Sequence, residues 1–399
     1  MSRFVLVVNA GSSSLKYELL DVDSGESRAE GLVEKIGESS SHARHSTNGE
    51  TFDRDGVCPD HAAAFGWLTA AFHDHGPDLD DVDLTAVGHR VVHGGAQFTA
   101  PTLVTDEVLS EIERLIPLAP LHNPGNLAGI RVALERFPVT PQVAVFDTAF
   151  HQTLPPAAYT YAIPTAWRVQ HRVRRYGFHG TSHAYVSRRT AELCGLSSSK
   201  ANVIVLHLGN GASATAVRGG RSVDTSMGLS PLEGLVMGTR PGDLDPSLPA
   251  HLARAGLALE EYDHALNHES GLLGLAGTRD FRELTELVAH GDENAVLALG
   301  VVAHRLKKYV GAYTAVLGHV DALAFTAGVG EHSPQVREAA LAGLESLGIE
   351  LDLVANAAAT CGEHLISTPS SRVAVWVVPT NEELEIARQA AALVAQQPD

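Results

Sequence analysis

The chain has 399 residues, and its 29 lysines and arginines against 47 aspartates and glutamates give a formal net charge of −18. A chain of this length exceeds what one hydrophobic core usually supports, so two domains are expected. The acidic balance repels polyanions from most of the surface, which excludes nucleic acid as an expected partner. Any phosphate chemistry must therefore depend on locally placed arginine and lysine side chains.

Cysteine usage and hydropathy indicate the compartment. The three cysteines, Cys58, Cys194 and Cys361, are scattered and form no CxxC pair, so neither a disulfide framework nor a thiolate metal site is expected. No apolar run approaches the roughly 18 to 20 residues of a membrane span. The first residues enter a strand without the basic and apolar regions of a signal peptide. We therefore expect a cytoplasmic protein with no membrane partner.

Residues 4–21 predict a β-hairpin, because apolar residues alternate with polar ones on both sides of a short polar tip. The tip holds Asn9, Gly11 and three consecutive serines, and Lys16 follows it. Backbone N–H groups, hydroxyls, an amide and an ammonium group suit a phosphate. The same residue types also form ordinary exposed turns, so this loop alone leaves both interpretations open.

The hairpin pattern recurs later in the chain. Residues 203–217 repeat the order of strand, loop and strand at a spacing of 198 residues, which aligns Asn9 with His207. Residues 82–95 and 320–333 form a second related pair, each an apolar strand that runs into a glycine-containing loop. The repetition predicts two similar α/β domains that face each other across a cleft and each lend a loop to one ligand.

Two apolar strands of the first half end in charged residues. One carries Arg90 near its end, and the other ends in Asp147. Because α/β proteins place their ligands at such strand ends, both are candidate site residues. We place the domain boundary just after Asp147, with residues 1–148 plus the C-terminal helix 381–399 in one domain and residues 149–380 in the other.

The second half contains a long segment that is rich in glycine and proline, residues 224–252, with one central arginine, Arg240. A structureless loop of this length inside a compact domain is usually functional. Arg240 is therefore a candidate for binding an anionic ligand.

Capping signals predict two helices near the end of the chain. One begins at Ser333, carries proline at its first position and stops at Gly348, so its positive N-terminus would face the glycine loop 328–332. The C-terminal helix is predicted to begin with a capping box between Thr380 and Glu383.

Three motif matches suggest other functions, and each is a weak signal. Residues 209–214 and 328–333 resemble the glycine-rich loops of an NAD-dependent dehydrogenase. The first leads into a strand and not a helix, and the second has no clear βαβ unit around it. Residues 179–183 carry two histidines but lack the glutamate of an HExxH zinc site. A non-catalytic sensor built on an actin-like fold is a further alternative, although many reactive polar residues lie on predicted loops.

Nine ordered motifs between residues 4 and 388 together resemble the acetate kinases, the acetokinase branch of the actin, sugar kinase and Hsp70 superfamily. The motifs are NAGSSSLKYELL, GHRVVHGG, APLHNPGNL, FDTAFHQTLP, YGFHGTSH, HLGNGAS, DTSMGLSPLEGLVMGTRPGDLDP, FTAGVGEH and PTNEELEIA. The resemblance implies two duplicated actin-like, ribonuclease H-like α/β domains with mixed sheets flanking a nucleotide cleft. It also implies an ATP-dependent enzyme that interconverts acetate and acetyl phosphate, uses Mg²⁺ with Mn²⁺ as an alternative, and works as a homodimer.

The same resemblance assigns roles to residues in the matching motifs. In the first domain, which would bind the acyl and phosphoryl groups, Asp147 would be the catalytic carboxylate and Arg90 would bind acetate or the phosphoryl group. His179 and Arg240 would stabilise the transition state. The pocket for the acetate methyl group would be lined by Val92, Leu121, Phe178 and Pro231.

The remaining carried-over roles concern metal and nucleotide. Magnesium would be held by Asn9, through water, and by Glu382. The second domain would bind the nucleotide, with Lys16 of the first domain reaching its phosphates. The nucleotide-binding residues would be Lys16, His207, Leu208, Gly209, Asn210, Gly211, Asp280, Phe281, Arg282, Gly328, Val329, Gly330, Glu331 and His332.

Phosphoryl transfer asks for such a set, because negative charge spreads over three equatorial oxygens and the enzyme mainly contributes positioning and fixed positive charge. Arg90, Arg240, His179 and Mg²⁺ would supply that charge. Acetate has a pKa near that of a glutamate side chain, about 4.3, so it is ionised at neutral pH and needs no general base. We therefore expect Asp147 to orient an arginine or a magnesium-bound water.

Several points stay open at the level of sequence. His332 stands where the family commonly has asparagine, which leaves that nucleotide contact undecided, and residues 37–59 match no motif. Propionate kinase activity is the close alternative, because one methylene in an apolar pocket changes binding by only about 1 to 3 kcal/mol. Nucleotide preference, physiological direction and dimer contacts are not encoded in any motif.

Overall fold

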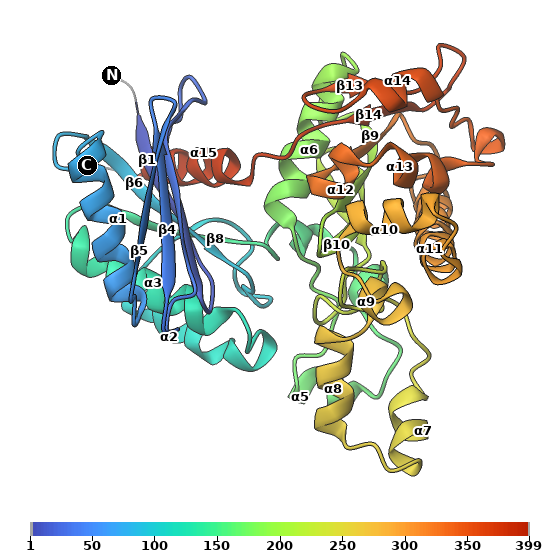
Figure 1. Cartoon of the computed structure of the whole chain (residues 1–399), viewed down its shortest axis with the longest axis horizontal. Coiled ribbons are helices and arrows are strands. Elements are labelled where there is room, and N and C mark those ends of the chain that lie inside the picture. The colour runs from blue at the N-terminus through green and yellow to red at the C-terminus, as the bar shows by residue number, and fades with distance from the viewer. Residues whose placement is uncertain (1–2, 398–399) are drawn as a thin grey trace. The chain divides into compact units, whose positions relative to one another are not determined.

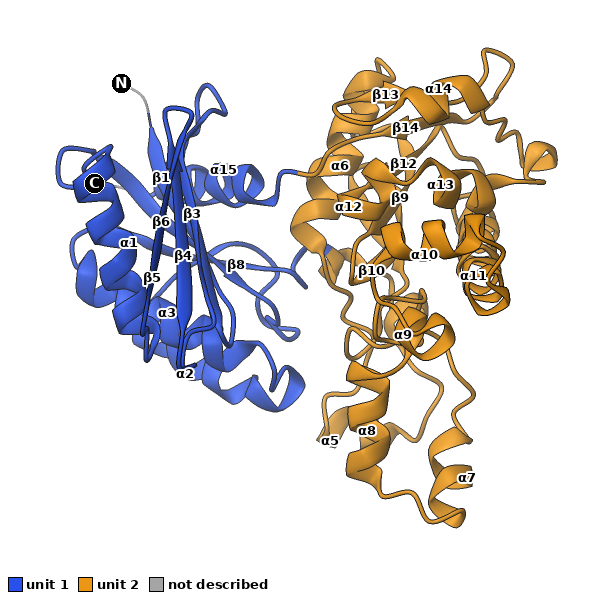
Figure 2. Cartoon of the chain, in the orientation of Figure 1, with its two compact units in different colours: residues 1–150, 381–399 blue, residues 151–380 orange. Residues whose placement is uncertain are grey.

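Two mixed β-sheets organise the chain, one in each of two compact units. The computed structural model describes residues 3–397 (Figure 1). The first unit contains the described chain up to Phe150 and again from Asn381, and the second unit contains His151–Thr380 (Figure 2). The boundary expected after residue 148 lies two residues before this division. Within the described residues, no helix is both long enough and apolar enough to cross a membrane.

The first sheet has eight strands in the order β5-β4-β3-β2-β1-β6-β8-β7. β1 is antiparallel to β2 and parallel to β6, β6 is parallel to β8, and β7 is antiparallel to β8. The strands are β1 (Phe4–Ala10), β2 (Ser14–Asp21), β3 (Ser27–Glu34), β4 (Ser41–Thr47), β5 (Glu50–Gly56), β6 (Leu84–Val91), β7 (Thr102–Leu103) and β8 (Gln142–Phe146).

The second sheet repeats this plan in the order β11-β10-β9-β12-β14-β13. β9 is antiparallel to β10 and parallel to β12, β12 is parallel to β14, and β13 is antiparallel to β14. The duplication expected from the sequence repeat is therefore confirmed, with β9 in the place of β1 and β12 in the place of β6. The strands are β9 (Asn202–Leu208), β10 (Ala212–Arg218), β11 (Arg221–Thr225), β12 (Ala322–Thr326), β13 (His364–Leu365) and β14 (Ala374–Val377).

Helices cover both faces of the first sheet. Leu6 and Val8 of β1 belong to the core that packs against α1 and α3, whereas Val5 and Val7 pack against Ile386 of α15. Both faces of this strand are apolar because both are buried. The helices of this unit are α1 (His61–His75), α2 (Asp106–Arg114), η1 (Ile116–Leu118), α3 (Asn123–Arg136) and α15 (Glu382–Val394).

The second sheet is also covered on both faces. Val186 of α6 packs against Val203 and Val205 of β9, and the long helix α11 packs against β9 and β10. The remaining helices are η2 (Phe150–Thr153), α4 (Pro156–Tyr159), α5 (Thr165–Gln170), α6 (Gly180–Leu193), α7 (Leu248–Arg254), α8 (Leu259–His268), α9 (Gly271–Ala276), α10 (Phe281–Ala289), α11 (Glu293–Leu317), α12 (Ala327–His332), α13 (Pro334–Leu341), η3 (Glu345–Leu347) and α14 (Leu353–Ala358).

The region after β12 differs from its sequence prediction. Residues 328–332, expected as a loop, are helical and belong to α12. Ser333 caps the next helix as predicted, and its hydroxyl oxygen accepts a backbone N–H at 3.4 Å. The helix nevertheless ends at Leu341 and not near Gly348, because the chain turns at Gly343 with a φ of 78°.

Asn381, and not Thr380, caps the C-terminal helix α15. The Asn381 side-chain oxygen accepts the N–H of Leu384 at 2.8 Å, whereas the Thr380 hydroxyl donates to the hydroxyl oxygen of Ser182 at 2.8 Å. The predicted capping box between Thr380 and Glu383 is therefore wrong, because the asparagine offers its oxygen one residue closer to the helix.

The cap assignment predicts that two alanine substitutions in or next to α15 change the stability of the protein by different amounts. An Asn381→Ala substitution removes the capping oxygen and should lower the free energy of unfolding by about 1 kcal/mol. Urea unfolding followed by circular dichroism measures this change. Arg388→Ala, an exposed position of the same helix, is the matched control and should change stability by less than about 0.5 kcal/mol. Equal stability of the Asn381 variant and the wild type would contradict the assignment.

Candidate functional site

At one edge of the first sheet, three neighbouring parallel strands change from apolar to polar side chains. Alternation along each strand puts these polar residues on the face that α15 covers. They are Asn9 after Val5 and Val7, Arg90 after Ala86 and Gly88, and Asp147 after Val143 and Val145. Figure 1 shows α15 lying beside β1 and β6. The polar side chains therefore gather near the first turn of α15, which carries Glu382 and Glu383.

Arg90 and Asp147 form a bidentate ion pair. Arg90 Nε donates to Asp147 Oδ1 at 3.0 Å and Arg90 Nη2 donates to Asp147 Oδ2 at 2.8 Å. Arg90 Nη1 also lies 3.5 Å from Glu382 Oε2. Burial acts to lower the pKa of Arg90, but the two carboxylates outweigh it and raise that pKa. Burial raises the pKa of Asp147, and the Arg90 charge opposes this effect. The pair fixes the guanidinium in one orientation.

Lys16 pairs with Glu383 rather than standing free. Its ammonium group is in direct contact with the Glu383 carboxylate. Burial acts to lower the pKa of Lys16, but Glu383 outweighs it and raises that pKa. Lys16 lies opposite Asn9 in the pairing of β1 with β2. A residue predicted to contact nucleotide phosphate thus already has a carboxylate partner, and Glu383 has a role that sequence reasoning missed.

The tip of the first hairpin is held by two helices of the same unit. His61 Nε2, at the start of α1, donates to the carbonyl oxygen of Gly11 at 2.8 Å, and Asn126 of α3 donates to that of Ala10 at 2.7 Å. A Cβ on Gly125 would lie 2.6 Å from the Gly11 oxygen, so glycine at this position lets α3 approach the tip. Sequence reasoning missed these supports, although each is a polar residue in the first turn of a helix.

The residues expected around the acetate methyl group divide between the units. In the first unit, Val92 is half-buried and its N–H donates to Asn126, whereas Leu121 is 50% exposed. In the second unit, Phe178 is buried and Pro231 is half-buried. The carbonyl oxygen of Phe178 accepts the His151 Nε2 proton at 2.9 Å.

His179 is held in an uncommon backbone conformation at the start of α6. Its φ and ψ are 57° and 29°, in the left-handed region that side chains other than glycine rarely adopt. Its Nδ1 lies 2.9 Å from the hydroxyl oxygen of Ser213, and its ring stacks on His207 at 4.2 Å. Such a conformation costs of order 1–3 kcal/mol and clusters at functional sites, so it supports a functional role for this histidine.

Arg240 is a partly buried guanidinium without a carboxylate partner among residues 3–397. Its Nη1 donates to the Pro231 carbonyl oxygen at 3.3 Å and lies 4.0 Å from Met237 Sδ. Burial lowers the pKa of Arg240. A Cβ on Gly211 would lie 3.6 Å from His179 Nε2 and 3.9 Å from Arg240 Nη1, so both side chains reach the same glycine. A buried cation without a counter-charge is costly unless an anion binds it.

Residues 226–247, most of the segment predicted as a loop, form a firmly held loop that carries Arg240, whereas residues 224–225 belong to β11 and residues 248–252 to α7. No helix or strand interrupts residues 226–247. Arg175 Nη1 donates to the carbonyl oxygens of residues 225–227 at 3.0 to 3.1 Å, and Glu233 of the loop pairs with Arg175. The N–H of Gly234 donates to Asp243 Oδ1 at 2.9 Å. These bonds fix the loop without using Arg240.

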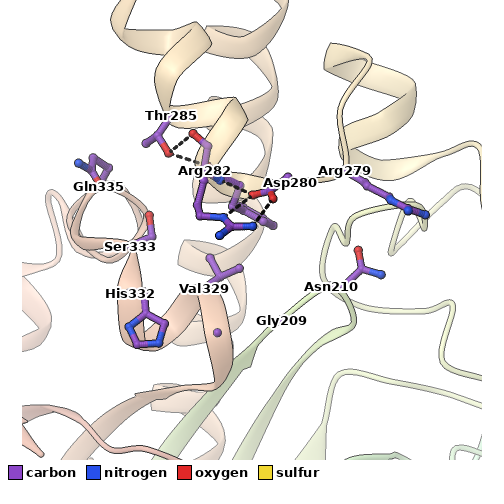
Figure 3. A pocket seen from close by; sticks show the side chains of 12 residues that line it. Gly209, Asn210, Arg279, Asp280, Arg282, Thr285, Val329, His332, Ser333 and Gln335 are labelled. Carbon is purple, nitrogen blue, oxygen red and sulfur yellow. Dashed lines mark hydrogen bonds and ion pairs between the residues drawn. The ribbon is translucent and has the colours of Figure 1, made fainter. Parts of the chain in front are cut away.

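A pocket of about 470 Å³ lies in the second unit (Figure 3). It is lined by Gly209, Asn210, Arg279, Asp280, Phe281, Arg282, Thr285, Gly328, Val329, His332, Ser333 and Gln335. Most of these were predicted as nucleotide-binding residues. Arg279, Thr285, Ser333 and Gln335 were missed, although Thr285 lies about one helical turn after Phe281 and could have been found from the helix period.

Other predicted nucleotide residues do not line this pocket. They are Lys16, His207, Leu208, Gly211, Gly330 and Glu331. The carbonyl oxygens of Gly330 and Glu331 instead accept hydrogen bonds from Arg337 Nη1 at 2.9 and 2.8 Å. Arg337 is fully buried, and burial lowers its pKa to about 10. It holds the end of α12, which sequence reasoning also missed.

Within the pocket, Figure 3 shows Arg282 folded back onto Asp280. Arg282 Nη2 donates to Asp280 Oδ2 at 2.7 Å, and Arg282 lowers the pKa of Asp280 to about 2. The His332 ring donates its Nδ1 proton to the carbonyl oxygen of Thr360 at 3.0 Å. A neutral His332 therefore keeps Nε2 as a hydrogen-bond acceptor.

Comparison with known proteins gives consistent matches over nearly the whole chain. The model of the acetokinase family matches residues 4–388. An acetate kinase of Streptomyces griseus is 59% identical over 98% of this chain and 96% of its own length. An acetate kinase of Leifsonia xyli is also 59% identical, over 98% and 99%.

Solved structures agree with these matches. The crystal structure of Porphyromonas gingivalis acetate kinase is 43% identical, covers 98% of this chain and 100% of that chain, and gives a TM-score of 0.94. A propionate kinase from Francisella tularensis is 41% identical, covers 97% and 98%, and gives a TM-score of 0.91. The expected α/β fold of two duplicated mixed sheets is thereby confirmed.

The pocket geometry predicts the effect of filling it. Thr285→Trp should weaken ATP binding roughly 10- to 100-fold, because forcing a larger side chain into occupied space costs about 1–3 kcal/mol. Isothermal titration with ATP measures the dissociation constant. Glu286→Trp, at an exposed neighbouring position of α10 that does not line the pocket, should bind ATP as the wild type does. Unchanged ATP affinity in the Thr285 variant would place the nucleotide elsewhere.

Proposed function

The chain belongs to the acetokinase family, and we propose that it transfers the terminal phosphoryl group of ATP directly to the carboxylate of acetate, giving ADP and acetyl phosphate, and also catalyses the reverse reaction. This activity is that of the acetate kinases. The observation that carries the mechanism is Arg240, a partly buried guanidinium that has no carboxylate partner among the described residues and lies with His179 at Gly211.

In the second unit, the 470 Å³ pocket would hold the nucleotide. The glycine loop 209–211 joins that pocket to His179 and Arg240, because Gly209 lines the pocket and Gly211 meets both side chains. Phosphoryl transfer mainly needs positioned donors and fixed charge around three equatorial oxygens. Arg240 would supply charge and His179 a hydrogen bond to the group in transfer.

In the first unit, Arg90 would bind the acetate carboxylate or the phosphoryl group, and Asp147 would orient Arg90. The bidentate pair supports an orienting role, because both Asp147 oxygens accept hydrogen bonds from Arg90. Acetate is ionised near neutral pH and needs no base. Val92 and Leu121 are the residues of this unit that we propose for the methyl group, and Phe178 and Pro231 are those of the second unit.

Asn9 and Glu382 fit a role in holding Mg²⁺, with Mn²⁺ as an alternative. Magnesium prefers hard oxygen ligands and is usually bound by one or two carboxylates together with water and substrate phosphates. The Asn9 amide and the Glu382 carboxylate are such donors near one sheet edge. When bound, the ion would neutralise charge that develops on the phosphates. Glu382 also faces Arg90 at 3.5 Å, so its carboxylate would be shared.

Propionate is the alternative acyl substrate. A propionate kinase is among the similar structures, and the discrimination against one methylene is worth only about 1 to 3 kcal/mol. We favour acetate because the acetate kinases of Streptomyces griseus and Leifsonia xyli are 59% identical to this chain. A homodimeric state and a cytoplasmic location are part of the proposal and have family membership as their support.

The NAD-dependent dehydrogenase alternative is not retained. Residues 209–214 lie in the antiparallel hairpin of β9 and β10, and residues 328–332 are helical. Neither forms the turn between a strand and a helix that binds a dinucleotide. Family membership likewise disfavours a non-catalytic sensor.

Replacement of Arg240 tests the proposed function. Arg240→Ala should lower turnover with acetate, ATP and Mg²⁺ by roughly 1,000-fold or more, by analogy with other phosphoryl-transfer arginines. The circular dichroism spectrum should be unchanged, because Arg175 and Asp243 hold the loop and the Arg240 side chain adds little more than a long, 3.3 Å hydrogen bond to the Pro231 carbonyl oxygen. Arg254→Ala, an exposed arginine of α7, is the control and should keep wild-type turnover. Near wild-type activity of the Arg240 variant would refute the assignment.

Replacement of Asp147 separates orientation from proton transfer. Asp147→Asn keeps the shape but loses the charge that fixes Arg90, so turnover should fall while the pH profile between pH 6 and 9 keeps its wild-type shape. Steady-state kinetics across that range, with saturating acetate, measure both quantities. If the wild type shows an activity rise with pH that the Asp147 variant lacks, Asp147 acts as a general base.

A further inference from the structure

A buried hydroxyl group contacts two histidines at the start of α6. The oxygen of Ser213, on β10, lies 2.9 Å from His179 Nδ1 and 2.7 Å from His183 Nε2. Ser213 and His183 are both 0% exposed. His179 immediately precedes α6 and His183 lies in its first turn, and the Ser213 oxygen contacts both rings. This is the HGTSH motif, whose second histidine has no role in the proposed reaction.

The hydroxyl proton can point in one direction only. A serine has a single O–H donor, so Ser213 donates to one of the two rings and accepts a proton from the other. The choice decides which nitrogen of His179 carries the proton. If Ser213 donates to His179 Nδ1, the neutral His179 ring must be protonated on Nε2.

The surroundings of His183 decide this choice. His183 Nδ1 is fully buried and has no hydrogen-bond partner among residues 3–397. A buried N–H without a partner is rarer and more costly than an unused acceptor lone pair. The His183 proton therefore sits on Nε2, where it donates to Ser213. Burial, with smaller contributions from His151 and His207, lowers the pKa of His183 well below 6.5, so the ring stays neutral.

We propose that His183 and Ser213 are positioning residues that fix His179 in the tautomer with its proton on Nε2, so that a neutral His179 donates a hydrogen bond to the phosphoryl group. The chain of donors runs from His183 Nε2 to the Ser213 oxygen, and from the Ser213 hydroxyl to His179 Nδ1. This leaves the proton of His179 on the nitrogen that lies with Arg240 at Gly211. The proposal rests on the function proposed above.

Basic side chains of the second unit lie around His179. They include His183 in the first turn of α6, His207 stacked on it from β9, and Arg240 from the loop. A nearby guanidinium disfavours a second positive charge. A donor that needs no additional proton keeps working above pH about 6.5, where an ordinary histidine loses its charge. In this tautomer His179 would donate its hydrogen bond without first gaining a proton.

Nitrogen-15 NMR of the full-length protein labelled with ¹⁵N-histidine tests the proton position directly. The His179 signals are identified by their loss in His179→Gln. We expect the chemical shifts of a neutral ring with Nε2 protonated from pH 7 to pH 9. A proton on Nδ1, or a doubly protonated ring at pH 7, would overturn the proposal. This readout does not depend on turnover.

Steady-state kinetics of Ser213 and His183 variants test the proposal in a second way. Ser213→Ala should move the His179 proton partly to Nδ1 and lower kcat roughly 10-fold or more, with little change in the KM values, because the bond acts in the transition state. His183→Gln keeps a side-chain N–H that can donate to Ser213 and should retain more activity than His183→Leu.

The matched control is Ser222→Ala, which removes another fully buried hydroxyl that contacts a histidine, His151, at 2.9 Å. It should keep the wild-type kcat and His179 signals. A Ser213→Ala protein with unchanged tautomer and kcat would overturn the proposal. Absence of acetate phosphorylation in the wild type would instead refute the proposed function and leave the tautomer assignment standing. If Ser213→Ala fails to fold, the ¹⁵N NMR spectrum of the wild type still shows which nitrogen of His179 carries the proton.

Discussion

The ends of the parallel strands decide where this protein can place charge. β1 and β8 are buried on both faces, so their interior positions are apolar, and polar side chains occur at their ends. Because β1, β6 and β8 run in the same direction, Asn9, Arg90 and Asp147 emerge at one edge. The apolar core thus positions the polar groups, and the chemistry depends on strand register being correct.

The duplicated sheets support different chemistry at equivalent edges. In the first unit, the helix that covers the sheet begins with two acids, Glu382 and Glu383. In the second unit, the covering helix α6 begins beside two histidines, His179 and His183. In the first unit, the strand ends therefore bring cations next to carboxylates. In the second unit, Arg240 lies next to imidazoles and a glycine loop at the equivalent strand ends. The two sheets thus share their strand order, while the side chains at equivalent strand ends differ.

Charge compensation differs between the cations, with consequences for their roles. Lys16 is 45% exposed in its pair with Glu383, and exposed pairs are worth only about 0–1 kcal/mol, so Lys16 can exchange its partner at little cost. The buried pair of Arg90 and Asp147 is different, because breaking such a pair costs roughly 3–5 kcal/mol. Arg240 has no carboxylate partner among the described residues that a ligand would have to displace. Its loop is fixed by Arg175 and Asp243, so the guanidinium is available for an incoming anion.

The sequence by itself determined the duplication, the polar strand ends, the Arg240 loop and the cap at Ser333. These follow from local patterns, in which a strand alternates over a few residues and a cap acts within one helical turn. Only the tertiary structure decided that Asn381 caps α15, that residues 328–332 are helical and that Lys16 meets Glu383. That last pair joins side chains 367 residues apart. Its formation depends on how α15 packs on the first sheet, and no local pattern encodes such packing.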